Sequence, residues 1–231
     1  MKVLIVNTYD NGGAANACIR LHMALIDKSI DSQLLTSRSL KFCKNTTVLK
    51  PRTKTLGFFE RLNILIIKVL INFRIISEKT NEREQFLDKR KEENLEIFTF
   101  PDSDYDITES QLYKEADIIN LHWVAGFLDY TSFFEKNKKP IVWTLHDMNP
   151  ILGGEHYKET YCGIDNSGNI KNRVISETER QYEQSIFAIK KRALNNKANI
   201  TIVSPSQWLL NEGTQSTIFA GYPSYCIPNG I

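Results

Sequence analysis

The sequence predicts an open, doubly wound α/β domain: a parallel sheet with helices on both faces. Three observations support this. Short apolar runs alternate with helical patterns along most of the 231 residues. The strand-like runs are continuously apolar, as expected of parallel strands covered on both faces. The repeated order of strand, helix and strand favours right-handed crossovers within one sheet.

The elements follow from these patterns in chain order. We expect strands at Val3–Val6, Ser32–Thr36, Ala116–Leu121, Pro140–Leu145 and Asn199–Val203, and helices at Ala14–Lys28 and Glu177–Leu194. A further helix should begin after Ser204, with Ser204 as N-cap and Pro205 at the first helical position.

Composition restricts the class of protein. With 42% apolar and 24% charged residues, the chain has the balance of a soluble globular protein. A net charge of +2 is too small to indicate nucleic acid as a partner. The four cysteines are widely spaced and form no CxxC pair, which favours a reducing compartment over a disulfide framework. The apolar run Val3–Val6 is too short for a signal peptide.

A glycine pair directly follows the first strand. Gly12 and Gly13 precede Ala14, where the helical pattern begins. The first amide groups of a helix lack internal partners and carry the positive end of its dipole. Because glycine permits close approach to the backbone, this turn predicts a site for a phosphorylated ligand. The alternative is that the pair is only a tight connection.

Polar side chains also follow two later strands. His122 and Trp123 come after Ala116–Leu121, and His146 and Asp147 come after Pro140–Leu145. In parallel sheets, ligands bind beyond the carboxyl ends of the strands, so these residues should share one edge with the glycine pair. Structural roles are the alternatives: His122 and Trp123 as core packing, and Asp147 as the cap of a turn.

Two stretches interrupt the alternating pattern. Residues 38–76 are rich in Lys and Arg, with Glu60 as the only acid, and are strongly apolar from Leu56 onward. The apolar part, Leu56–Ile76, predicts a helix that covers the sheet or, alternatively, lies on an anionic membrane surface. Interrupting charges exclude a membrane-spanning helix. The second stretch, Asn149–Arg173, predicts a long functional loop.

Other site classes have weak support. The full G-x-G-x-x-G fingerprint is absent, and Thr36, Ser37 and Arg38 at the end of the second strand include no acid for a ribose hydroxyl. His156 and Cys162 lack a second pair of metal ligands, so we expect no metal site. Neither a Walker motif nor a G-x-S-x-G motif occurs.

Three segments together resemble a known family. They are Met1–Asn7 with Gly12–Ala15, then Ala116–Trp123, and finally Trp143–Met148. They are similar to the N-terminal, Rossmann-like domain of GT-B glycosyltransferases of family 4, above all bacterial enzymes that build capsule, exopolysaccharide or lipopolysaccharide. The likeness spans residues 1–231 as one domain. Cys226–Ile231 resembles the hinge strand that leads to the family's C-terminal donor-binding domain, which has no counterpart here.

The resemblance implies a function and roles for matching residues. The protein would transfer a sugar, as a hexosyltransferase does, from a nucleotide-sugar to a glycan or lipid-linked acceptor with retention of configuration and no cofactor. Gly12, Gly13 and Ala14 would bind the donor diphosphate, and His146 would act at the transferred sugar. His122, Trp123 and Asp147 would face the acceptor. Without its donor-binding half, the chain alone would be inactive.

Two alternatives remain open: a non-catalytic domain that binds a glycan or phosphate ligand, and an unrelated phosphate-ligand protein with a flavodoxin-like sheet. The glycosyltransferase interpretation implies a cytoplasmic protein, with peripheral contact to the inner face of the plasma membrane through residues 38–76 and no nucleic-acid partner.

Overall fold

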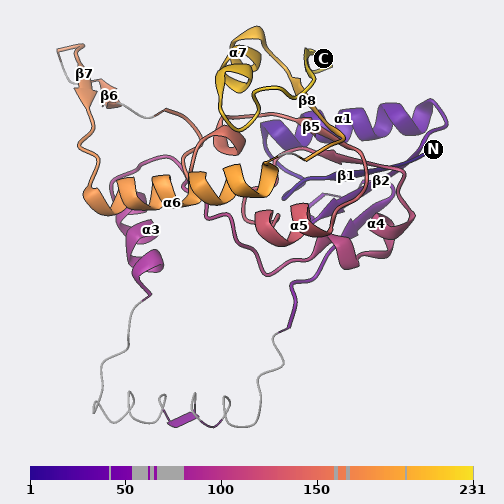
Figure 1. The fold of residues 1–231 in the computed structure, drawn as a ribbon, viewed down its shortest axis with the longest axis horizontal. Coiled ribbons are helices and arrows are strands. Elements are labelled where there is room, and N and C mark those ends of the chain that lie inside the picture. Colours follow the sequence, from indigo (N-terminus) through magenta and orange to yellow (C-terminus); the bar gives the residue numbers. More distant parts are fainter. Residues whose placement is uncertain are drawn as a thin grey trace. The chain divides into compact units, whose positions relative to one another are not determined.

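A fully parallel, seven-stranded sheet forms the centre of the larger of two compact units, residues 1–51 and 97–231 (Figure 1). This computed structural model describes the chain except residues 42, 54–61, 63–64, 67–80, 159–160, 165–166, 196 and 231. The strands of the sheet are β1 (Lys2–Val6), β2 (Asp31–Thr36), β3 (Thr46–Val48), β4 (Ile118–Leu121), β5 (Ile141–Thr144), β8 (Ile200–Ser204) and β9 (Ser224–Cys226).

The strand order identifies the topology. It reads β3-β2-β1-β4-β5-β8-β9, and every neighbouring pair is parallel. This is a Rossmann-like doubly wound order, with its switch point between β1 and β4. The predicted fold class is therefore confirmed. A flavodoxin-like sheet, which our third alternative requires, has a different order, so that topology is wrong for this chain.

Alternating side chains divide the core between two faces of the sheet. Val3 and Ile5 pack with Cys18 of helix α1 (Gly13–Asp27) on one face. Leu4 and Val6 belong to the larger cluster on the other face. Helices α5 (Tyr130–Lys136) and α6 (Glu177–Leu194) contribute to that larger cluster. Trp143 of β5 is fully buried there and stacks on Phe134 at 5.8 Å between ring centroids.

Shorter helices complete this unit: η1 (Ile107–Glu109), α4 (Gln111–Glu115), η2 (Asn149–Ile151) and α7 (Gln207–Gln215). Helix α7 begins two residues later than expected. Its N-cap is Ser206, whose hydroxyl accepts from the backbone amide of Leu209 at 3.3 Å. Ser204 is not the N-cap because it still belongs to β8 and pairs with Cys226 of β9.

The predicted loop Asn149–Arg173 contains regular structure. Besides η2, it holds an antiparallel pair, β6 (Tyr161–Ile164) and β7 (Ile170–Asn172), which form their own two-stranded sheet. The loop prediction is thus wrong for these residues. Antiparallel strands need only a short connection, and the polar turn at Ser167–Asn169 lies between them.

Residues 52–96 form the second compact unit. Its helix α3 (Glu82–Glu92) has Asn81 as N-cap, acids in its first turn and bases in its last. This charge order complements the helix dipole. Most of the predicted apolar helix from Leu56 to Ile76 lies outside the described residues; Leu62, Leu65 and Ile66 are described, helical and exposed. Among the described helices, none combines the length and hydropathy that a membrane crossing requires.

Candidate functional site

The carboxyl ends of the central strands meet at one edge of the sheet. Beyond β1, the amide of Thr8 donates to the carbonyl of Trp123 at 2.8 Å, and the amide of Ser37 donates to the carbonyl of Thr8 at 3.0 Å. The amide of Leu145 donates to the carbonyl of Val203 at 2.8 Å. These bonds place the segment after β1 beside those after β2 and β4, and the end of β5 beside β8. The segment after β5 lies beside the segment after β4, because Nε2 of His146 is 2.9 Å from Nδ1 of His122. The predicted shared edge of the glycine pair and His146 is therefore confirmed.

The glycine turn leaves open space at the start of α1. Gly12 has φ 94° and ψ 177°, a conformation that only glycine adopts readily. A Cβ atom on either Gly12 or Gly13 would meet nothing within 4 Å. The first turn of α1 carries no acidic residue, and no side chain caps its free amides. Among the described residues, no side chain competes for these amides, so the turn offers hydrogen-bond donors to a ligand.

Asp10 fixes the position of this turn. Its carboxylate accepts from the amides of Leu40 and Lys41, at 2.7 and 2.6 Å, and from the Ser39 hydroxyl at 2.8 Å. Burial alone would raise the pKa of Asp10, but these hydrogen bonds outweigh it and the pKa is lowered. Asp10 thus ties the segment after β1 to the segment after β2, and its oxygens are already used.

His122 and His146 form a hydrogen-bonded chain with a fixed direction. The amide nitrogen of Asn120 donates to the carbonyl of Val142 at 2.8 Å, so its oxygen faces Nε2 of His122 at 2.9 Å. Nε2 of His122 must therefore carry the proton. Nδ1 of His122 then accepts from Nε2 of His146, also at 2.9 Å. It follows that in the neutral pair Nδ1 of His146 carries a lone pair.

Both imidazoles are neutral at physiological pH. Burial lowers the pKa of His122 to about 3, and the neighbouring His146 contributes to this shift. Burial likewise lowers the pKa of His146 to about 4, against the opposing effect of Asp147. His122 is buried, whereas His146 is half-buried. His146 therefore presents a hydrogen-bond acceptor at the strand edge, and His122 orients it.

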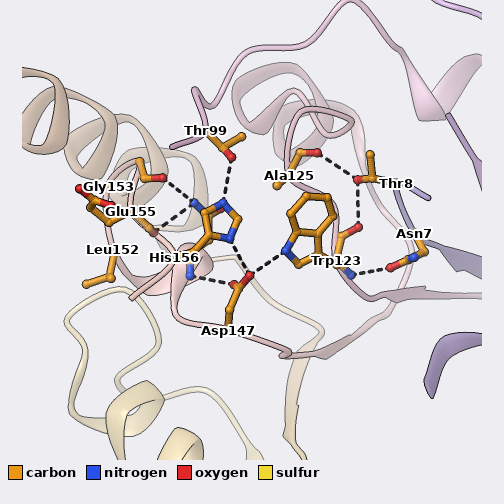
Figure 2. A network of polar contacts seen from close by, with 12 residues as sticks. Asn7, Thr8, Thr99, Trp123, Ala125, Asp147, Leu152, Gly153, Glu155 and His156 are labelled. Atoms are coloured by element: carbon orange, nitrogen blue, oxygen red, sulfur yellow. Dashed lines mark hydrogen bonds and ion pairs between the residues drawn. The ribbon is translucent and has the colours of Figure 1, made fainter. Parts of the chain in front are cut away.

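A second network starts at Asp147 (Figure 2). One carboxylate oxygen, Oδ2, accepts from Nε1 of Trp123 at 2.7 Å and from Nδ1 of His156 at 2.6 Å. The other, Oδ1, accepts from the amide of Asn149 at 3.0 Å. Nε2 of His156 lies 2.9 Å from the Thr99 hydroxyl. The network therefore links the segments that follow β4 and β5 to residues 99 and 156.

Two charged side chains of α6 hold the loop that contains these groups. The Lys190 ammonium donates to the carbonyl and side-chain oxygens of Asn149, at 2.6 and 3.2 Å, and to the carbonyl of Gly153. The Glu183 carboxylate accepts from the amides of Gly153 and Gly154, both at 2.6 Å. Lys190 is completely buried, and burial lowers its pKa to about 7.

Sequence reasoning missed His156 as part of the network, together with Thr99, Glu183 and Lys190. A signal for Lys190 was present in the helical pattern. It lies four residues after Ile186 and four before Leu194, both buried, so it interrupts an apolar stripe. A lysine at such a position must find acceptors inside the protein. No comparable pattern marks Thr99 or His156.

The predicted site residues occupy different environments along this edge. Gly12 and Gly13 are exposed, while Ala14, Trp123 and His146 are half-buried. His122 and Asp147 are buried, and their polar atoms bond to protein groups. A ligand that touched either of them would have to displace such a bond. Asp147 also caps the turn at Asn149, as the structural alternative predicted. Among the described residues, no group of His, Cys, Asp and Glu side chains is arranged to hold a metal ion.

No protein-family model matches the chain, and no curated protein matches it. The function therefore has to be argued from the site.

Proposed function

We propose that this chain is the acceptor-side, Rossmann-like domain of a retaining glycosyltransferase of the GT-B type, similar to family 4. It would work with a nucleotide-sugar donor and a glycan or lipid-linked acceptor in bacterial cell-surface polysaccharide synthesis. One observation carries the proposal: an oriented, neutral His146 shares a strand edge with a glycine turn that has open space beside it and no side-chain cap.

The chemistry of that edge suits a diphosphate-linked sugar. Free amides at the start of α1 are donors for phosphate oxygens. Nδ1 of His146 is an acceptor for a sugar hydroxyl, and the lowered pKa keeps it an acceptor at neutral pH. A hydrogen bond to a hydroxyl of the transferred sugar lowers the barrier if it strengthens as charge develops at the anomeric carbon.

The buried residues act indirectly in this proposal. His122 holds His146 in one tautomer, and Asp147 fixes the indole of Trp123. We therefore assign His122 and Asp147 to positioning, and keep Trp123, which is half-buried, as the acceptor contact. Donor choice would depend on residues outside this domain.

Paired variants of His146 test the proposal. In a sugar-transfer assay with the full-length gene product and a panel of UDP-, GDP- and ADP-sugars, His146→Gln should slow transfer on the order of 100-fold. Glutamine can keep the donor toward His122 but has no acceptor at the Nδ1 position. His146→Asn retains an acceptor near Nδ1 and should be less impaired. Near-normal turnover of His146→Gln in a folded protein would contradict the assignment.

A membrane-associated acceptor would explain the basic, apolar character of residues 38–76. Vesicles containing phosphatidylglycerol should co-sediment with the protein, and replacing Lys54, Arg61, Lys68 and Arg74 by Gln should abolish this. Co-sedimentation unchanged by the four substitutions would remove the membrane contact but leave the transferase proposal intact.

The alternative, a domain that binds a glycan without transferring sugar, makes a separate prediction. Glycan would then bind the full-length protein, while no donor of the panel would yield a product.

A further inference from the structure

A row of π-systems lies along the same strand edge. The guanidinium carbon of Arg38 sits 5.7 Å from the centre of the Tyr9 ring. The Tyr9 and Trp123 ring centroids are 5.8 Å apart at an interplanar angle of 36°. Trp123 and His156 follow at 5.5 Å and 37°. The row therefore runs from the end of β2, across β1, to the segment after β4.

One end of this row is rigid and the other is accessible. Trp123 is fixed by its indole bond to Asp147 and by its amide, which donates to the Asn7 side chain at 2.8 Å. Tyr9 is 36% exposed, and Arg38 is exposed. Within the described part of the chain, neither the Tyr9 phenol nor the Arg38 guanidinium has a hydrogen bond or an ion pair. Both groups can therefore contact a ligand without breaking a polar contact of this kind.

An exposed aromatic ring held beside a half-buried indole and a polar site matches the chemistry of a sugar ring. The faces of Tyr and Trp carry negative electrostatic potential, and the C–H groups on one face of a pyranose are weakly positive. A sugar can lie against such rings while its hydroxyls stay in water. A guanidinium beside the rings adds a bidentate partner for a carboxylate or phosphate on that sugar.

We propose that Tyr9, Trp123 and Arg38 form a binding site for an anionic sugar residue of the acceptor, one whose pyranose ring carries a carboxylate or a phosphate. The inference rests on the proposed function and gives its acceptor a chemical class. The site adjoins the reacting position, because Trp123 directly follows His122 and His122 bonds to His146.

A matched pair of probes isolates the charge. Trigalacturonate and its fully methyl-esterified form have the same rings, and only the first is anionic. Saturation-transfer NMR on the full chain should show binding of trigalacturonate about tenfold tighter than binding of the ester. Glucose 6-phosphate, in a parallel titration, distinguishes phosphate from carboxylate as the preferred anion. Equal affinity for the acid and the ester would overturn the proposed charge selectivity.

Substitutions then test which residues bind the sugar. Tyr9→Ala should weaken trigalacturonate binding about tenfold, while Tyr9→Phe, which keeps the ring, should stay within about twofold. Arg38→Gln should remove the preference for the acid over the ester. Lys28→Gln, an exposed change at the opposite end of α1, is the control and should have no effect.

The outcome separates this inference from the proposed function. Binding that is insensitive to Tyr9→Ala and Arg38→Gln would overturn the site even if the protein transfers sugar. Binding of uridine in place of the sugars, lost in Tyr9→Ala, would identify a nucleobase platform and also overturn it. Loss of transfer in His146→Gln with trigalacturonate binding unchanged would support both conclusions.

Discussion

Two glycine pairs follow strands of the same sheet, and they are glycine for opposite reasons. At Gly12–Gly13 an added Cβ atom would meet nothing within 4 Å, and the backbone of Gly12 is strained for any other residue. At Gly153–Gly154 no positive φ requires glycine. There a Cβ on Gly153 would lie 2.2 Å from the carbonyl oxygen of Glu183, and one on Gly154 would lie 2.2 Å from the ring of Phe98.

The space beside each pair indicates a different role. Beside the first pair, an added Cβ would meet no atom of the described residues within 4 Å, which leaves room for a ligand. The second has its space filled by the protein, so that Glu183 and Lys190 can clamp the loop carrying His156. The dipeptides are identical, and only tertiary contacts distinguish the open pair from the filled pair.

Among the single substitutions, the largest loss of stability is expected at the filled pair. Gly154→Ala should lower the free energy of unfolding by about 3 kcal/mol or prevent folding, because the Phe98 ring would have to move. Gly13→Ala, at the first residue of α1, is the matched control and should change it by less than about 1 kcal/mol. Urea denaturation measures both. Equal stability of the two variants would contradict the account of the filled pair.

A smaller loss of stability should follow from removing the Lys190 ammonium, which holds the loop at that pair. Lys190→Met should cost about 2 to 3 kcal/mol, because the carbonyls of Asn149 and Gly153 lose a buried donor. Lys191→Met, on the neighbouring exposed position, should stay within about 0.5 kcal/mol. Thermal unfolding of the pair is the measurement. If the two variants have the same melting temperature, Lys190 does not stabilise the loop.

The open pair should be sensitive to backbone conformation and not to side-chain volume. Gly12→Ala should destabilise by about 1 to 3 kcal/mol, because a residue with a Cβ is strained at φ 94° and ψ 177°. Gly13→Ala has no such strain. Circular dichroism during urea denaturation compares them. A Gly12→Ala protein as stable as Gly13→Ala would show that this turn adopts another conformation in solution.

A further effect is graded and concerns pH. His122 and His146 have lowered pKa values in the folded chain, about 3 and about 4, so below the ordinary value of 6.5 the unfolded state binds more protons. Stability should therefore fall with decreasing pH from about 6.5 to about 4, by about 1.4 kcal/mol per pH unit for each histidine. In His146→Gln the slope should decrease. An unchanged slope would show that the pair does not titrate as described.

The sequence was sufficient for the fold class and for placing Gly12 and His146 at one edge of the sheet. Continuous apolar runs marked the central strands, and the parallel arrangement required that Gly12 and His146 share an edge. Local pattern could not show the short strands β3, β6 and β7, because their identity depends on pairing with partners. It also misplaced the start of α7, where Ser204 and Ser206 are equivalent cap candidates until β9 pairs with Ser204.

The chemistry of the site was only partly accessible from the sequence. His122 and His146 could be named as strand-end histidines, but their tautomers depend on the Asn120 amide and the Val142 carbonyl. His156 joins Asp147 across a loop whose path depends on Lys190 and Glu183. Such long-range hydrogen bonds produce no repeating pattern in a single sequence.

The most direct test of the central claim is heteronuclear NMR that follows the amides of Gly12 and Gly13 together with the ring nitrogens of His146. Free His146 should show the neutral tautomer protonated at Nε2. Titration with UDP-, GDP- and ADP-sugars should shift all three residues with one dissociation constant for at least one donor. Shifts caused by FMN or NADP alone, or a nucleotide-sugar that shifts the glycine amides but leaves the His146 ring unchanged, would contradict the account.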